Sequence, residues 1–158
     1  MASISPGYTT TEKVRAALGV TDNEVLDEFF NQDLGTALEL DLLDWYPDHA
    51  VVWAAYKAPV ASVGERRAGM TLQLFSLWFC TAEIATLWLA MPQRISDGKD
   101  DMRRFADVDL KAIAENAADK RDTYRDQLLL LEDPDTILGY AQIGAASPGY
   151  DPVTGIQT

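Results

Sequence analysis

The stretch from Glu65 to Leu131 most constrains the fold, because it has the pattern of two long helices joined by a short loop. We expect the first helix to run from about Glu65 to Ala90, where Pro92 stops it. Asp97-Gly98 marks the turn, and the second helix should follow from about Asp107 to Leu131. Its predicted inner face consists of Val108, Ile113, Ala117, Tyr124, Leu128 and Leu131.

Shorter helices are expected before this pair, which gives an all-α prediction: a helical bundle with two long antiparallel helices. Residues 1–8 are expected to fray, and Thr9 with Glu12 could cap a first helix that Gly19 ends. Thr21 and Glu24 should start a second helix, limited by Pro47. Its buried stripe is predicted to be Leu26, Phe30, Leu34, Leu38, Leu42 and Trp45.

Three smaller features complete this part of the prediction. Gly35 interrupts the second helix, and a bend or a close contact is expected there. His49 to Tyr56 is predicted to be a brief apolar helix or strand. Ala58 to Gly64 is the connector that leads to the first long helix.

The segment Gly139 to Thr158 differs in composition from everything before it. It is rich in Gly, Pro and small residues, has no Lys or Arg, and contains a single acid. We therefore divide the chain into a helical bundle domain, residues 1–138, and an extended C-terminal tail, residues 139–158. A packed helical body that ends in such a tail is typical of a subunit that reaches into a neighbour.

The charge balance argues against a nucleic-acid-binding protein. The chain has 25 acids, 13 bases and a net charge of −12, whereas nucleic-acid binders usually carry a basic surface. No Lys or Arg lies between Arg15 and Lys57, while nine acids do. This acidic stretch is either a solvated face or a surface that repels nucleic acid or attracts a basic partner.

No group of residues indicates catalysis, so we expect no catalytic, cofactor-binding or metal-binding residues and no enzyme. The single histidine, His49, cannot complete a zinc site or a catalytic triad, and an exposed or capping role is expected for it. Phosphate-binding and dinucleotide-binding loops are missing. Cys80 is interpreted as a buried core residue. The four tryptophans are interpreted as core or subunit-contact residues.

The apolar stretch Met70 to Met91 is long enough to raise the question of a membrane span. Gln73 and Glu83 interrupt it, and an unpaired acid near the middle of a span is costly in lipid. We therefore favour a central helix covered by the others, without a membrane, and keep the span as a lesser alternative. In the last helix, Lys120, Arg121 and Arg125 alternate with acids, which indicates a solvated or subunit-facing surface.

The layout resembles the head–tail connector, or adaptor, proteins of tailed bacteriophages. The resemblance covers roughly residues 9–131 and rests on four features: a short capped helix (TEKVRAALGV), a long apolar helix, an SDG-type loop, and a charged helix with a Tyr (DLKAIAENAADKRDTYRDQLLLL). A Gly/Pro tail follows, as in that family.

The resemblance implies a structural virion subunit, assembled in the host cytoplasm and located at the head–tail interface. It implies a homo-oligomeric ring of about twelve subunits. The ring would dock on the portal protein, extend the DNA channel without binding DNA specifically, and carry the next tail component, a nozzle or tail-tube/terminator protein. The implied portal-docking anchors in the tail are Tyr140, Ile143, Tyr150 and Pro152. The implied subunit–subunit contacts are Lys120, Arg121, Tyr124 and Arg125.

An alternative from a different class is a soluble helical scaffolding or regulatory domain. Such a domain would bind a basic partner through the acidic segment 22–48.

Overall fold

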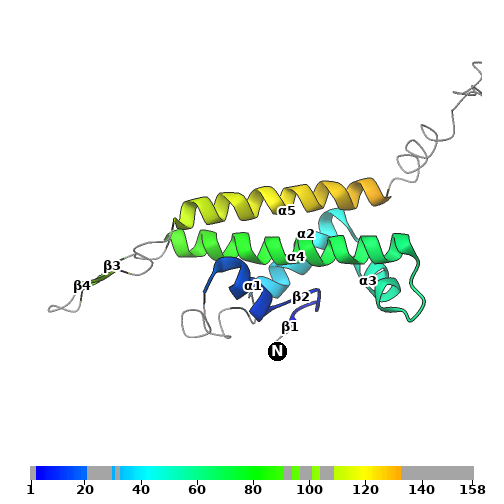
Figure 1. Cartoon of the computed structure of the whole chain (residues 1–158), viewed down its shortest axis with the longest axis horizontal. Helices are drawn as coiled ribbons and strands as arrows, with labels where there is room; N and C mark the ends of the chain where they lie inside the picture. The colour runs from blue at the N-terminus through cyan, green and yellow to red at the C-terminus, as the bar shows by residue number, and fades with distance from the viewer. Residues whose placement is uncertain are drawn as a thin grey trace, which may run out of the picture.

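A computed structural model describes residues 3–20, 30, 33–90, 94–96, 101–103 and 109–132 of the chain (Figure 1). The described part is mostly helical, so the all-α class is correct at that level, with two small antiparallel strand pairs added. The elements are β1 (Ser3–Ile4), β2 (Thr9–Thr10), α1 (Thr11–Leu18), α2 (Asp33–Trp45), α3 (His49–Lys57), α4 (Val63–Ala90), β3 (Arg94–Ser96), β4 (Asp101–Arg103) and α5 (Leu110–Glu132).

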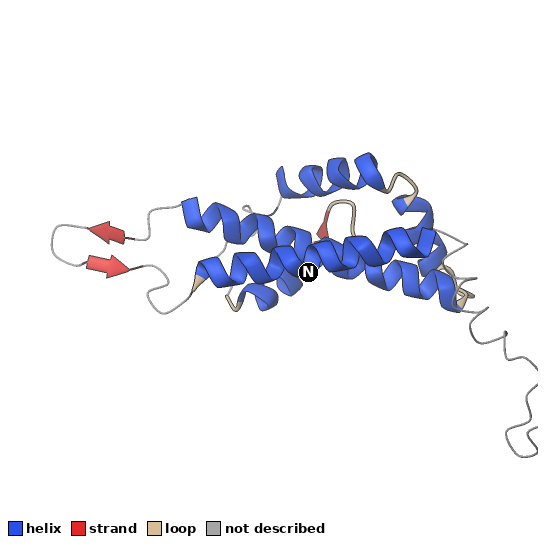
Figure 2. Ribbon diagram, turned by 90° about the horizontal axis from the view of Figure 1, so that it is seen from above, coloured by secondary structure: helices blue, strands red, loops and turns tan. Residues whose placement is uncertain are grey.

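The two long helices α4 and α5 lie side by side, and α5 runs back along α4 (Figures 1 and 2). Ser62 and Glu65 form a capping box at the start of α4: the Ser62 N–H donates to Glu65 Oε2 at 2.6 Å, and the Glu65 N–H donates to Ser62 Oγ at 3.2 Å. At the start of α5, Asp109 Oδ1 accepts from the Ala112 N–H at 3.0 Å. Both caps fix where the long helices begin.

The predicted inner face of the last helix is largely confirmed. Ala117 and Leu128 are fully buried, and Ile113 and Tyr124 are half-buried against the core. Leu131 is half-buried in the last turn of α5, whereas Val108 lies outside the described residues. The polar residues between these positions face outward because the apolar ones recur every three to four residues.

The prediction of a short loop between the long helices is wrong, because the connection is longer and contains two strands. Residues 94–103 instead include a β-hairpin, in which Arg94 pairs with Arg103, Ile95 with Met102 and Ser96 with Asp101. Asp97-Gly98 lies between the paired strands, outside the described residues. An Asp-Gly dipeptide is a strong hairpin signal, and here the flanking residues pair as strands. Figure 2 shows β3 and β4 beyond the ends of α4 and α5.

The N-terminal segment also departs from the prediction, because residues 3–8 are not frayed. β1 and β2 pair, with Ile4 opposite Thr9, and Ile4 and Tyr8 are buried at 2% exposure each. Burial of these two apolar side chains holds the hairpin on the helices. Helix α1 is capped by Thr10, one residue later than predicted, and ends as predicted at Gly19, whose φ is +72°.

Helix α2 carries the predicted buried stripe over its described length. Leu34, Leu38 and Leu42 are buried, as is Phe30 before the helix, and Trp45 is half-buried; Leu26 lies outside the described residues. The predicted close contact at Gly35 is confirmed. A Cβ there would stand 3.0 Å from the carbonyl oxygen and the Cβ of Ser5, so glycine lets the N-terminal hairpin approach α2.

Of the two structures left open for His49–Tyr56, the helix is correct, since α3 spans His49–Lys57. It packs on the first half of α4, where Gly69 is buried: a Cβ at that glycine would stand only 2.3 Å from Tyr56 Cβ and Cγ. α4 supplies the greatest part of the described core, including Leu72, Phe75, Phe79, Cys80, Ile84, Ala85 and Trp88.

The helix segment Val63–Leu89 is long and apolar enough to cross a membrane, by length and composition only. The mean hydropathy of its 18-residue window is 1.3. Of that window, 56% is buried inside the molecule. The central helix of a protein core has the same length and composition.

Candidate functional site

Two cationic side chains of α5 contact tryptophans on other helices. The Lys120 Nζ lies 3.9 Å from the centroid of the Trp78 ring on α4. The Arg125 Cζ lies 4.9 Å from the ring of Trp45 on α2. A cation over an indole face is attracted by the negative face of the ring. Lys120 and Arg125 therefore act, in this structure, as contacts between helices.

Trp45 is fixed in turn by its own surroundings. Its Nε1–H donates to Asp41 Oδ2 at 2.9 Å, one turn earlier in α2. Its ring meets the Phe75 ring edge to face, with centroids 5.0 Å apart. The ring of Trp45 on α2 thus contacts Phe75 on α4 and Arg125 on α5.

The four predicted subunit-contact residues fall into different environments. Arg121 pairs with the adjacent Asp122, with Nη2–Oδ1 and Nε–Oδ1 distances of 2.8 Å. Tyr124 is half-buried against the core, while Lys120 and Arg125 cover the tryptophans. Their contact with another subunit stays a prediction. Sequence reasoning missed the cation–tryptophan pairs because Trp45, Trp78 and their partners are far apart in the chain.

The predicted tail anchors Tyr140, Ile143, Tyr150 and Pro152 lie outside the described residues. The same holds for the acids of the segment at positions 22–28. What the structure describes of the acidic segment is α2 and the turn after it, with Glu39, Asp44 and Asp48 exposed and Asp41 half-buried.

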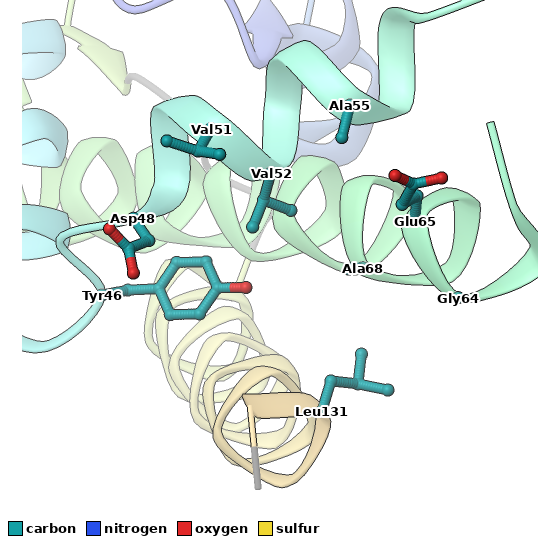
Figure 3. Close-up of a pocket in the computed structure, with 9 residues that line it drawn as sticks. All are labelled: Tyr46, Asp48, Val51, Val52, Ala55, Gly64, Glu65, Ala68 and Leu131. Carbon is teal, nitrogen blue, oxygen red and sulfur yellow. The ribbon is translucent and has the colours of Figure 1, made fainter. Parts of the chain in front are cut away.

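An open groove of about 510 Å³ lies where α5 ends. Figure 3 shows the side chains of Tyr46, Val52 and Leu131 turned toward it from three segments of the chain. Asp48, Val51, Ala55, Gly64, Glu65 and Ala68 complete its lining. The walls are mainly apolar, and the Glu65 carboxylate is already bonded to the Ser62 N–H, so the groove suits an apolar side chain better than a charged ligand.

His49 is buried, which corrects the expectation of an exposed or capping residue. Only 4% of it is exposed, and its Nδ1 is hydrogen-bonded to the Tyr8 hydroxyl. The Tyr8 ring also meets the Trp53 ring edge to face, with centroids 4.9 Å apart. The predicted role failed because the partner of His49 comes from the N-terminal hairpin, which was expected to fray.

Burial governs the titration of this pair. It lowers the pKa of His49, and the nearby negative charge of Glu39 opposes that shift. Burial and Glu39 together raise the pKa of Tyr8 to about 12. The Tyr8 hydroxyl therefore keeps its proton at pH 7 and can donate a hydrogen bond to the unprotonated Nδ1 of His49. The hydrogen bond between Tyr8 and His49 joins the N-terminal hairpin to α3.

Cys80 is completely buried in α4, as expected of a core residue, and burial raises the pKa of its thiol to about 12. The described residues contain no group of three or more His, Cys, Asp or Glu side chains arranged to hold a metal ion. No protein-family model, curated protein or solved structure matched the chain.

Proposed function

We propose that the chain is a non-enzymatic structural subunit of a tailed-bacteriophage virion, a head–tail connector or adaptor. In this role a ring of subunits docks on the portal, extends the DNA channel and provides the platform for tail attachment. One observation carries the proposal: two long paired helices form the body, and the Gly/Pro-rich segment 139–158 follows soon after α5 ends at Glu132. This layout is the one on which the family resemblance rests.

The surface charges are compatible with a channel through which DNA passes. The chain carries 25 acids against 13 bases, a net charge of −12, so its surface is acidic on balance. Phosphates of passing DNA would be repelled by such a surface rather than adsorbed.

The exposed apolar side chains support an assembly role as well. Leu40, Leu43 and Met70 are each more than half exposed, on two different helices. Single exposed leucines are ordinary, but faces that repeat them at helical spacing favour contact with another protein.

Deletion of residues 139–158 tests the docking role of the tail. We expect the truncated chain to lose binding to the cognate portal protein while its helical circular dichroism stays that of the full chain. Tyr140→Ala with Tyr150→Ala should weaken binding at least tenfold, because buried aromatic anchors dominate interface energy. Unchanged portal binding by the truncated chain would remove the tail from the proposal.

A second candidate function is a soluble scaffolding or regulatory domain that binds a basic partner through the acidic segment 22–48. The observation that favours it is the wholly acidic charge of α2 around two exposed leucines. Binding of this kind should weaken steeply between about 50 and 500 mM salt, since exposed charge pairs are screened. A connector held by apolar anchors should respond much less.

A further inference from the structure

The outward face of α2, here called the acidic face, is an apolar stripe flanked by acids. Leu40 and Leu43 are 63% and 51% exposed and lie three residues apart, so they share one side of the helix. Glu39 stands four residues before Leu43, and Asp44 four residues after Leu40, so one acid lies on either side of the leucines. Both acids are exposed.

The first half of α4 has an uncovered face, here called the basic face, with the same plan and the opposite charge. Val63, Met70 and Leu74 recur at helical spacing and are 86%, 56% and 36% exposed. Arg66 and Arg67 lie between Val63 and Met70, one on either side of the stripe, and both are exposed. Two apolar stripes, one edged by carboxylates and one by guanidinium groups, are complementary in charge and in polarity.

The acidic and basic faces point away from each other, so they cannot meet within one molecule. α2 packs on the side of α4 that carries Phe75, whose ring meets Trp45. Phe75 lies five residues from Met70, which places it about 140° around the helix. On α2, Trp45 stands five residues from Leu40, so the acidic face likewise turns away from α4. Figure 2 shows α2 along one side of the paired long helices.

We infer that the acidic face of one copy of this chain binds the basic face of the next copy. The contact is head-to-tail: two different surfaces meet, so a row of copies has one free acidic face at one end and one free basic face at the other. Such a contact repeats until it closes into a ring or continues as a filament. Bidentate pairing of Arg66 and Arg67 with carboxylates would fix the register, and the leucines and Met70 would supply the buried apolar area.

This inference deepens the proposed function. It rests on that function only for the step in which the repeated contact closes into a ring of the size that a portal accepts. It also gives the subunit contact a location different from that implied by the family resemblance. Lys120 and Arg125 already cover tryptophans of their own chain, whereas the side chains on the acidic and basic faces are exposed. Self-association can be measured without any portal, so failure of one idea does not imply failure of the other.

Charge reversal of each face tests the pairing in the full-length chain by sedimentation velocity over a wide range of concentration. We expect the unaltered chain to associate, and Glu39→Arg with Asp44→Arg to weaken association on the order of tenfold or more, because like charges then meet. Arg66→Glu with Arg67→Glu should do the same. The chain with all four changes should associate again, and Lys111→Glu on the exposed start of α5 should leave association unchanged.

Disulfide cross-linking tests the geometry of the contact directly. Oxidation of a chain with Leu43→Cys and Met70→Cys should give a ladder of linked multimers, while each single variant should stay unlinked through that position, because the contact is not symmetric. Circular dichroism of every variant shows whether the helices are intact. A chain that stays monomeric at all concentrations, or association that neither double reversal weakens, would overturn the inference.

Discussion

The ammonium group of Lys120 lies 3.9 Å from the centre of the Trp78 ring, so the charged surface of α5 is fastened to α4. Arg125 does the same to Trp45 on α2, at 4.9 Å. Both cations belong to the helix stretch that the sequence presents as a solvated or subunit-facing surface. Their first role is to hold three helices together, and that role can be measured without any partner.

A double-mutant cycle of Lys120→Met and Trp78→Leu should give a coupling free energy of about 0.5–1 kcal/mol, the usual size of a partly exposed cation–π pair. Urea unfolding followed by circular dichroism measures it. The same cycle on Lys111 and Glu115, an exposed i, i+4 pair with an N–O distance of 3.7 Å, serves as the control for a surface ion pair. Zero coupling between Lys120 and Trp78 would show that their contact contributes nothing to stability.

Gly69→Ala should destabilise the protein by about 1–3 kcal/mol, because the added Cβ would stand 2.3 Å from Tyr56 and must push α3 away from α4. Gly64→Ala, in the same helix, is the matched control. A Cβ there meets nothing nearer than Ser62 Oγ at 4.0 Å, and replacing a helical glycine gains up to about 1 kcal/mol. Melting temperatures that move in opposite directions for the two variants are expected; a stable Gly69→Ala variant would contradict the tight α3–α4 contact.

Acid should destabilise the fold through His49. Its pKa is lowered in the folded protein by burial, so its contribution to stability is fully present above the ordinary value of 6.5. That contribution is lost as pH falls from 6.5 through the folded pKa, because the unfolded chain takes up the proton first. Unfolding free energies between about pH 5 and 7.5 should show this slope.

His49→Gln provides the control for the pH slope, since the glutamine side chain can still accept a hydrogen bond from Tyr8 but does not titrate. The variant should lose the part of the slope that falls between pH 6.5 and the folded pKa. A slope that is the same in both proteins would show that His49 does not cause it.

The Cys80 thiol should be unreactive in the folded protein at neutral pH. It is fully buried and its pKa is raised to about 12, so almost no thiolate is available. A thiol reagent added at pH 7.5 should label the chain only when urea unfolds it. Rapid labelling in native buffer would mean that the middle of α4 opens readily.

Long helices were the part of the fold that could be predicted from the sequence. The stripes of α2 and α5 repeat apolar residues such as Leu38 and Leu42 over several turns, and Gly19 and Pro92 mark helix ends. Short strands could not be predicted in the same way. β1 and β2 have two residues each, too few for a period-2 pattern to show.

The environment of the candidate site residues was harder to predict, because it depends on contacts between distant segments. His49 is hydrogen-bonded to Tyr8, 41 residues earlier in the chain. Lys120 and Arg125 meet tryptophans on two other helices, which no local pattern reveals. The acidic face was anticipated only as a run of acids; that Leu40 and Leu43 stand exposed among them required the structure.

The most direct test of the connector proposal is electron microscopy of the cognate portal incubated with the full chain and with the chain lacking residues 139–158. The proposal predicts a ring of subunits beneath the portal with the full chain, and a bare portal with the truncated one. No ring with the full chain would contradict the proposed function, and a ring of equal occupancy with both chains would contradict docking through the tail.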